Sequence, residues 1–360
     1  MYVSGFEPKT ILFCGLGARQ PQQGYVHETG LPPASVQSWP AHSFSTEGII
    51  NDSNSTSSRR AAVIINPVKS LGEDFRSAFD IVCMEEGWGV PLWLETTADE
   101  AGGGQARIAL EGGADVVIAA GGDGTVRCVA EVVTGTGTPV GLVPLGTGNL
   151  LARDLGLGLS DSLGVARDIL TGTNSTMGAV RAVLDHSETE TQFLVASGLG
   201  YDATLIADTK DERKDRVGWL AYVYAGIRHL PGEGVKATIK VDGHEVAWRR
   251  VRGVMVGNCG KLMGGVEIFP DASFTDGFLD VLVLSPRSKF GWVGVIAGIF
   301  HHEGAQSRSV HYFSGTSAEI TLDSEQNFQF DGDPRGKARH LLVTADHQTL
   351  VIRIKSSPTT

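Results

Sequence analysis

The chain has 360 residues, 47 of them glycine, and carries 30 lysine and arginine residues against 41 aspartate and glutamate residues. Its formal net charge of −11 argues against a protein that binds nucleic acid in bulk, because such proteins usually carry a basic surface. A hydrophobic content of 41% suffices for apolar cores and excludes general disorder. The four cysteines are far apart in the sequence, which argues against a zinc ribbon or a disulfide scaffold.

Residues 1–60 are rich in Gln, Pro and Ser and show little periodicity, so we expect a mostly disordered extension there. No apolar run in the sequence reaches the roughly 18 residues that span a bilayer. The longest run, Phe290–Phe300, has about half that length. These features together predict a cytoplasmic protein.

Between residues 61 and 155, short apolar runs alternate with segments of helical periodicity. The predicted strands are Ala61–Asn66, Val90–Glu95, Asp115–Ala120 and Val140–Val143. The predicted helices are Phe75–Glu86, Ala98–Glu111, Val126–Thr134 and Leu150–Leu155. This alternation predicts a parallel α/β domain over residues 61–185, in which ligands bind beyond the carboxyl ends of the strands.

After about residue 180 the pattern becomes β-rich, with frequent turn signals. The predicted strands are Gln192–Ser197, Val235–Val241, Val251–Val256, Leu279–Leu284, Ala318–Leu322 and Asn327–Phe330, and one helix is predicted at Val217–Leu230. We therefore expect a second, antiparallel β-sandwich-like domain over residues 186–340. In residues 341–360, a last strand at Gln348–Ile354 is expected to return to the first domain.

The motif GGDGT at residues 121–125 stands between a predicted strand and a predicted helix. Backbone N–H groups of a glycine turn at a helix N-terminus can form a cradle for phosphate. A carboxylate at Asp123 would repel phosphate unless Mg²⁺ bridges the two, or unless Asp123 takes a proton from a substrate hydroxyl. The alternative is a structural turn in which Asp123 or Thr125 caps the helix.

A second glycine-rich loop, PLGTGN at residues 144–149, follows the next predicted strand. In two neighbouring strand–helix units, the two loops would face one crevice, and Thr147 and Asn149 could hydrogen-bond a nucleotide. The alternative is a tight turn with Asn149 as the N-cap. The chain has no GxxxxGK[ST] motif, so it is not a P-loop NTPase.

Two acidic turns occur in the β-rich half, Asp276-Gly277 and Asp331-Gly332-Asp333. Each Asp-Gly pair is most simply a hairpin turn. An enzyme that holds Mg²⁺ near Asp123 nevertheless needs further oxygen ligands or a base, and these turns are the obvious suppliers.

In their order along the chain, these motifs resemble the diacylglycerol kinase/sphingosine kinase catalytic family, especially the bacterial soluble lipid kinases. The resemblance covers residues 60–355 and rests on NP at 66–67, GGDGT at 121–125, PLGTGN at 144–149, GLGYDA at 198–203, PDASFTDGFLDV at 270–281 and FDGD at 330–333. NAD kinases and phosphofructokinases share the GGDG loop but are expected to lack the two last motifs.

The resemblance implies an enzyme that transfers the γ-phosphoryl group of ATP to a lipid hydroxyl with the help of Mg²⁺. The residues that would line the nucleotide are Asn66, Gly121, Gly122, Gly124, Thr125, Gly146, Thr147, Gly148 and Asn149. Asp123 would act near the transferred phosphoryl group and Mg²⁺, and Asp333 would be the base for the lipid hydroxyl. Asp276 and the backbone of Phe278 would form a supporting Mg²⁺ site.

The chain departs from the family pattern in three places. The first loop reads NPVKS, with Lys69 and Ser70, where the pattern is NPxSG-like. Leu150 follows GTGN where an aspartate is frequent, and Asp333 is one methylene shorter than the usual glutamate. None of these changes removes a group that phosphoryl transfer strictly requires.

Two other functions remain open, an NAD kinase-like phosphotransferase and a non-catalytic regulator that binds a nucleotide or a lipid. The identity of the lipid and the oligomeric state, a homodimer included, are also open. A lipid substrate implies transient contact with the inner membrane surface. For that contact the sequence offers the aromatic stretch Phe290–His302 and the helix Val217–Leu230.

Overall fold

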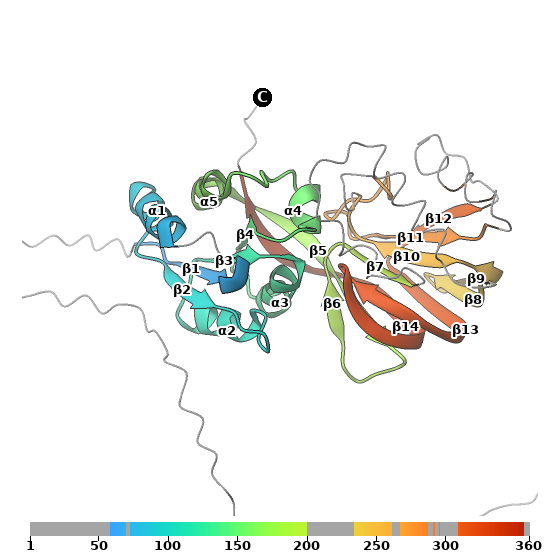
Figure 1. Ribbon diagram of the computed structural model, residues 1–360. Coiled ribbons are helices and arrows are strands. Elements are labelled where there is room, and N and C mark those ends of the chain that lie inside the picture. Colours follow the sequence, from blue (N-terminus) through green and yellow to red (C-terminus); the bar gives the residue numbers. More distant parts are fainter. Residues whose placement is uncertain are drawn as a thin grey trace, which may run out of the picture. The chain divides into compact units, whose positions relative to one another are not determined.

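Parallel strands with helices on both faces make up the first half of the fold (Figure 1). The computed structural model describes residues 58–69, 73–199, 234–260, 267–286, 291, 295 and 309–355. The parallel strands are β1 (Ala61–Ile65), β2 (Leu92–Glu95), β3 (Val116–Gly121) and β4 (Val140–Pro144). The helices are α1 (Glu73–Glu85), α2 (Gly103–Glu111), α3 (Asp123–Val133), α4 (Leu150–Asp154) and α5 (Ser162–Thr171), and a 3-10 turn spans Pro67–Lys69.

The strands at the centre of this sheet are buried on both faces. Every residue of β1 and β3 is buried, as expected for parallel strands between two helix layers. Helix α1 turns Phe75, Phe79 and Cys83 toward β1 and β3, because residues three or four apart share one face of a helix. Figure 1 shows α1 and α5 on one face of the sheet and α2 and α3 on the other.

Three helices begin at residues other than those predicted, and glycine explains two of the shifts. Helix α1 begins at Glu73 instead of Phe75. Helix α2 begins at Gly103 instead of Ala98, because Gly102 has a φ of 137°, which a helix does not allow. Helix α3 begins at Asp123 instead of Val126. There Gly122 is extended and is the N-cap that follows strand β3, so that the rest of the GGDGT loop already forms the first helical turn.

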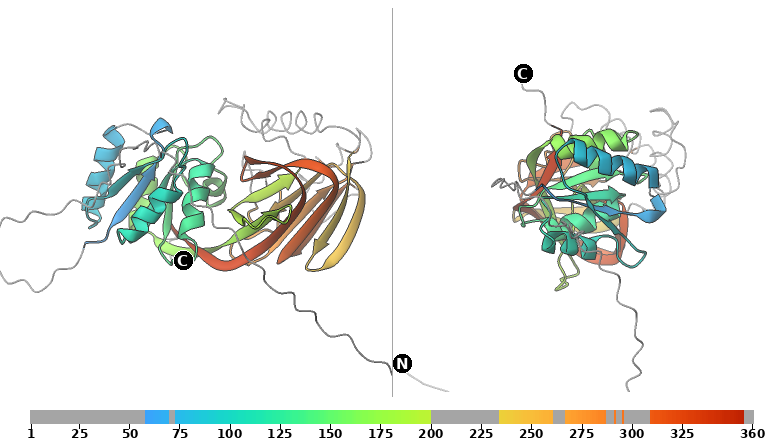
Figure 2. Two further views of the ribbon diagram at one scale, coloured as in Figure 1. Left: turned by 90° about the horizontal axis from the view of Figure 1, so that it is seen from below. Right: turned by 90° about the vertical axis from the view of Figure 1, so that its left-hand side faces the viewer.

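The second half of the fold is antiparallel (Figure 2). Its strands are β5 (Thr173–Leu184), β6 (Thr191–Phe193), β7 (Ala196–Leu199), β8 (Val235–Val241), β9 (His244–Val251), β10 (Gly253–Gly257), β11 (Leu279–Leu284), β12 (Val310–Gly315), β13 (Ser317–Phe330) and β14 (Asp333–Ile354). Within the described residues, all strands belong to one sheet with the main order β12-β11-β10-β7-β13-β14-β4-β3-β1-β2. The predicted fold class, parallel α/β followed by antiparallel β, is confirmed.

Strand β14 joins the two halves. It pairs antiparallel with β13 and β5, and at its end Ile352 pairs parallel with Val140 of β4. The strand predicted at Gln348–Ile354 is therefore the last part of a 22-residue strand. Similarly, the strands predicted at Ala318–Leu322 and Asn327–Phe330 are the two ends of β13, which has a register shift between them.

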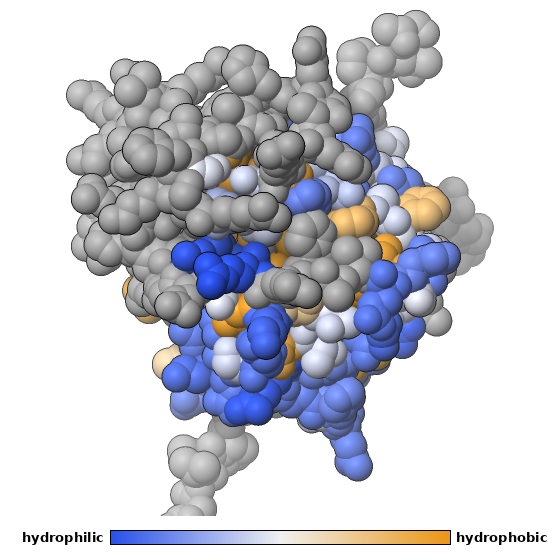
Figure 3. Space-filling view, turned by 90° about the vertical axis from the view of Figure 1, so that its right-hand side faces the viewer, coloured by the Kyte–Doolittle hydropathy of each residue, from blue (hydrophilic) through white to orange (hydrophobic). Residues whose placement is uncertain are grey.

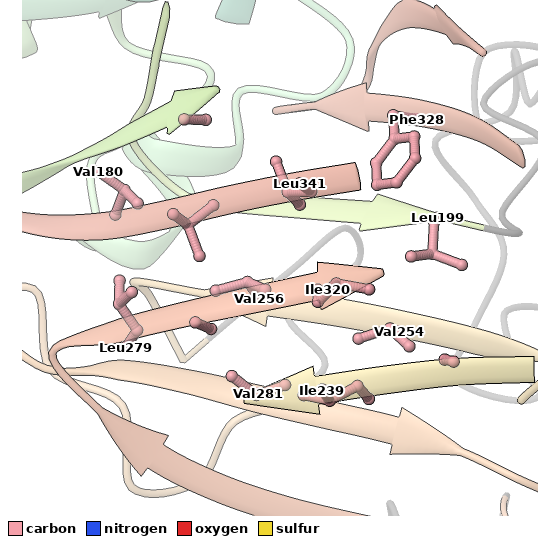
Figure 4. Packing of buried hydrophobic residues seen from close by; sticks show 14 of the residues in the cluster. Val180, Leu199, Ile239, Val254, Val256, Leu279, Val281, Ile320, Phe328 and Leu341 are labelled. Carbon is pink, nitrogen blue, oxygen red and sulfur yellow. The ribbon is translucent and has the colours of Figure 1, made fainter. Parts of the chain in front are cut away.

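The antiparallel strands enclose a core of aliphatic side chains and phenylalanines (Figure 4). Val180 of β5, Val256 of β10, Leu279 of β11 and Phe328 of β13 are each at most 1% exposed. Alternation along each strand directs these residues inward, which is the pattern that marked the strands in the sequence.

Some helices and strands of the structure were not predicted from the sequence, and some predicted ones lie outside the described residues. Helix α5 and strands β5, β9 and β12 were not predicted, because their apolar residues are interrupted by polar and charged ones. The extension at 1–60, apart from Ser58–Arg60, and the helix at Val217–Leu230 lie outside the described residues. Among the helices that are described, none combines the length and apolar character that crossing a membrane requires.

Candidate functional site

The two glycine loops touch each other at the carboxyl ends of β3 and β4. Gly121 pairs with Pro144 in the parallel ladder, and the Leu145 N–H donates to the Gly121 carbonyl at 2.9 Å. A Cβ on Gly146 would lie 2.6 Å from the Cα of Gly122, a distance that real Cβ atoms do not show. A Cβ on Gly121 would likewise lie 2.7 Å from the Thr125 side chain. The loops can therefore approach this closely only as glycines.

Asp123 lies between the two loops and is held by the second one. Its Oδ1 accepts a hydrogen bond of 2.6 Å from the Leu150 N–H at the start of α4. Its Oδ2 would lie 2.6 Å from a Cβ on Gly148, so any side chain at that position would displace the Asp123 carboxylate. Burial raises the pKa of Asp123 above its ordinary value, although backbone hydrogen bonds from Leu150 and Asn149 lower it, and the charge of Asp333 raises it further.

Asn149 uses its side chain to shape the second loop. Its Oδ1 accepts from the Gly146 N–H at 2.8 Å, and its Nδ2 donates to the Gly146 carbonyl at 2.7 Å. The backbone of Asn149 is left-handed, with a φ of 46°, a conformation that asparagine adopts more readily than most residues. Its side-chain amide is thus engaged within the loop, whereas the side chain of Thr147 is exposed.

The first loop of the chain brings a lysine to the same place. The Asn66 N–H donates to the Ala120 carbonyl at 3.0 Å, and Asn66 Oδ1 accepts from the Val68 N–H at 3.0 Å. The resulting turn places Lys69 Nζ 3.0 Å from the position that a Cβ on Gly122 would occupy. The loops that follow three neighbouring strands of the sheet, β1, β3 and β4, therefore meet, and they carry backbone N–H groups and one ammonium group.

Asp333, at the start of β14, lies against helix α3 although 210 residues separate it from Asp123 in the sequence (333 − 123 = 210). Its Oδ2 would be 3.4 Å from a Cβ on Gly124 and lies 3.4 Å from Arg127 Nη2. The side chain of Asp333 is about half exposed, at 46%. The GGDGT loop and the acidic turn of the β-rich half thus meet in one site.

Asp331 anchors that acidic turn. Asp331 and Gly332 both have positive φ angles, 50° and 89°, and separate the paired residues Phe330 and Asp333, as in a type I′ hairpin. The fully buried Asp331 carboxylate accepts hydrogen bonds from the Leu194, Val195 and Ala196 N–H groups at 2.8–3.0 Å. Burial raises the pKa of Asp331 to about 6, despite the opposing effect of these hydrogen bonds. Asp331 thereby fixes the place from which Asp333 extends.

The residues predicted for a supporting Mg²⁺ site lie on another loop. Asp276 Oδ1 accepts a hydrogen bond from the Phe278 N–H at 2.9 Å, and this loop is joined to β5 because the Gly178 N–H donates to the Phe274 carbonyl. Burial, together with the charges of Asp276 and Asp271, raises the pKa of Asp280 to about 6.

The carboxylates of Asp271, Asp276 and Asp280 give this loop and the start of β11 an excess of negative charge and offer only oxygen donors, and both properties suit a hard cation such as Mg²⁺. Between Asp276 or Phe278 and the glycine loops, the described part of the chain shows no hydrogen bond or ion pair. It also shows no ready-made group of three or more metal-ligating side chains. A cation there would complete its shell with backbone carbonyls and water.

The structure therefore brings together most, but not all, of the predicted site. The residues that meet are Asn66, Gly121, Gly122, Asp123, Gly124, Thr125, Gly146, Thr147, Gly148, Asn149 and Asp333. Three cations were missed as site residues, namely Lys69, Arg127 and Arg335. Lys69 was noted only as a departure from a pattern, and no sequence signal distinguishes the two arginines. The roles assigned to all these residues remain predictions.

Comparison with known proteins gives two family matches. Residues 60–182 match the model of the diacylglycerol kinase catalytic domain, and residues 195–350 match that of the YegS C-terminal NAD kinase beta sandwich-like domain. A probable lipid kinase YegS-like protein of Pseudomonas syringae pv. tomato is 30% identical over 284 residues, which are 77% of this chain and 87% of that protein. A diacylglycerol kinase of Bacillus subtilis is 25% identical over 288 residues, 77% of this chain and 91% of that protein.

The fold has counterparts among solved structures. The crystal structure of a diacylglycerol kinase from Bacillus anthracis matches with a TM-score of 0.61 at 18% identity, covering 83% of this chain and 98% of that one. The chain spans about half the length, 51%, of an uncharacterized Synechocystis protein that it also matches.

Proposed function

Because the chain belongs to the lipid kinase family that is defined by the diacylglycerol kinase catalytic domain and the YegS-like C-terminal domain, we propose that it transfers the γ-phosphoryl group of ATP to a lipid hydroxyl. The observation that carries this proposal is the meeting of Asp333 with the GGDGT loop at Gly124. A base must lie within reach of both the acceptor hydroxyl and the transferred group, and in this arrangement Asp333 would serve as that base.

The nucleotide phosphates would lie over the contact between the two glycine loops. The absence of side chains at Gly122, Gly146 and Gly148 lets phosphate oxygens reach the backbone N–H groups, and helix α3 directs its N-terminus there. Lys69 Nζ, positioned over Gly122, would neutralise part of the phosphate charge. The exposed Thr147 hydroxyl is available for a further hydrogen bond.

Asp123 and Asp333 would act on different groups, Asp123 on the phosphoryl group in transfer and Asp333 on the acceptor hydroxyl. The Leu150 N–H orients Asp123, and its Oδ2 lies beside Gly148 of the second loop. Asp333 would accept the proton of the acceptor hydroxyl as the new P–O bond forms and ADP leaves. Mg²⁺, held by Asp123 and supported through Asp276 and the Phe278 backbone, would supply charge neutralisation when bound.

The lipid would approach from the β-rich half, and contact with a membrane surface would be transient. The stretches proposed for that contact, Val217–Leu230 and Phe290–His302, lie outside the described residues apart from Gly291 and Val295. On the face that Figure 3 shows, the described surface is mainly hydrophilic with hydrophobic residues between. This distribution gives the membrane proposal no extra support.

The proposal is tested by phosphoryl transfer from radiolabelled ATP to a panel of diacylglycerol, sphingosine, ceramide and NAD, with Mg²⁺ present. We expect label in at least one lipid, and none when Asp123→Ala replaces the wild type or when Mg²⁺ is chelated. Label in NADP with none in any lipid would replace the proposal with the NAD kinase alternative. ATP binding without any label transfer would favour the non-catalytic regulator.

A further inference from the structure

Two arginines from different elements converge beside Asp333. Arg127 lies one helical turn after Asp123 on α3, and Arg335 lies two residues after Asp333 on β14. Arg127 Nη2 lies 3.4 Å from Asp333 Oδ2, and the charges of both arginines, of Asp333 and of Glu131 reach the Cys128 thiol. Neither arginine belongs to a motif that pointed to the function.

Arg127 is buried, and one of its N–H donors has no hydrogen-bond partner among the described residues. It is only 9% exposed, and its guanidinium group lies 3.4 Å from Asp333 Oδ2 and 3.8 Å from Glu131 Oε2. Its Nε is buried and has no hydrogen-bond partner among the residues that the structure describes. An unpaired buried donor of a charged group is unfavourable, so such a donor points to a ligand that completes it.

Arg335 lies at a β-bulge between β13 and β14. Gln329 pairs with Pro334 and Phe328 pairs with Gly336, so Arg335 is the extra residue of a β-bulge. Bulges re-aim side chains and are frequent beside active sites. The Arg335 guanidinium lies 5.4 Å from the centre of the buried Phe330 ring, and its Nε and Nη2 are buried without a partner in the described part of the chain.

We propose that Arg127 and Arg335 form a phosphate-binding subsite beside Asp333. Two guanidinium groups with unpaired N–H donors match the oxygens of a phosphate better than a single lysine would. Burial and the neighbouring Arg127 charge lower the pKa of Arg335, so an anion between the two arginines would relieve their repulsion. The role of Asp333 in this inference rests on the proposed function, but phosphate binding does not require turnover.

The phosphate could come from either substrate. It is the terminal phosphate of the nucleotide, or it is a phosphate in the headgroup of an acceptor lipid. In the first case the arginines stabilise the group in transfer. In the second they select acceptors that already carry a phosphate next to the reacting hydroxyl.

The test measures the melting temperature of the full chain with and without inorganic phosphate. Phosphate should raise the melting temperature of the wild type, because a ligand of the folded state stabilises it. Arg335→Gln should lose at least about half of this rise, and Arg335→Lys should lose part of it, since lysine keeps the charge but not the two-pronged donor. The matched control is Arg339→Gln, an exposed arginine on the same strand, which should keep the full rise.

A second arm repeats the titration with a saturating non-hydrolysable ATP analogue. If the analogue removes the Arg335-dependent part of the rise, the nucleotide supplies the phosphate. If that part persists, the acceptor supplies it, and either result supports the subsite. The proposal is overturned if Arg335→Gln lowers the melting temperature in phosphate-free buffer but leaves the phosphate response undiminished. Arg335 would then have a purely structural role.

Failure of this proposal and failure of the proposed function give different results. A chain that keeps its Arg335-dependent phosphate response but transfers no label to any lipid retains the subsite and loses the kinase assignment. A chain that labels lipid equally well with Arg335→Gln, and shows no altered phosphate response, retains the kinase assignment and loses the subsite.

Discussion

At the scale of single residues, Asp123 carries the chemistry while the backbone around it binds the nucleotide. Asp123→Asn keeps the size of the side chain and its acceptor for the Leu150 N–H but removes the negative charge. We expect kcat to fall by about 100-fold or more, with ATP affinity changed by less than about tenfold, since the charge acts on the group in transfer. Steady-state kinetics and direct ATP binding measure the two effects. Near-normal kcat would contradict this role.

The ionisation of Asp123 predicts the pH dependence of the reaction. Its pKa is raised by burial, so the carboxyl takes up a proton at a higher pH than an ordinary aspartate. If the ionised form is the active one, activity falls on acidification, with a midpoint above that of an exposed aspartate. The measurement is kcat/KM from about pH 4 to about pH 8 for the wild type and for Asp123→Asn, with protein integrity followed by circular dichroism. An acidic limb of the same shape in both proteins would show that the fall in activity does not report Asp123.

The contact between Gly122 and Gly146 makes a second prediction. Gly146→Ala would place a Cβ 2.6 Å from the Gly122 Cα and 2.7 Å from Asn149 Oδ1, so the loops must separate. We expect kcat/KM for ATP to fall by about 100-fold, because small displacements at a reacting site are costly. The control is Gly104→Ala in α2, where the new Cβ meets only the carboxyl end of the exposed Glu100 side chain, at 3.3 Å. That control should keep full activity and melt at the same or a higher temperature.

At the scale of elements, the β13–β14 hairpin positions Asp333 through Asp331. Asp331→Ala removes the acceptor of three buried N–H groups at residues 194–196. We expect the free energy of unfolding to fall by about 3 kcal/mol, as a buried donor without a partner costs about 1 kcal/mol or more. Urea unfolding measures the loss, with the exposed Asp323→Ala as the control. An unchanged stability would show that water replaces the carboxylate without cost.

At the scale of the whole molecule, β14 couples the two halves of the sheet. Ile352, which is 2% exposed, pairs with Val140 of β4 and with Ser175 of β5. Ile352→Ala should lower the free energy of unfolding by about 3 kcal/mol, through lost burial and the remaining cavity. Because one strand serves both halves, hydrogen-exchange protection should fall equally in β1–β4 and in β7–β11. A fall confined to β1–β4 would mean that the halves unfold independently.

Local patterns in the sequence determined much of the fold and the chemistry of the loops. The apolar runs before GGDGT and PLGTGN predicted strands β3 and β4, since a parallel strand buried on both faces needs a continuous apolar segment. Glycines at strand ends indicated backbone N–H groups open to a phosphate, whereas the close contact between Gly122 and Gly146 was not predicted. The ordered motifs pointed to the family that the comparisons support.

Only the tertiary structure decided which distant side chains meet and which polar groups are already engaged. The sequence predicts Asn149 as a nucleotide ligand, but in the structure its amide closes the loop on Gly146. The bulge at Arg335 and the burial of Arg127 depend on the pairing of β13 with β14 and on the approach of that hairpin to α3. Sequence periodicity reports which face of an element is buried, whereas partners 206 residues apart are selected by packing of the whole chain.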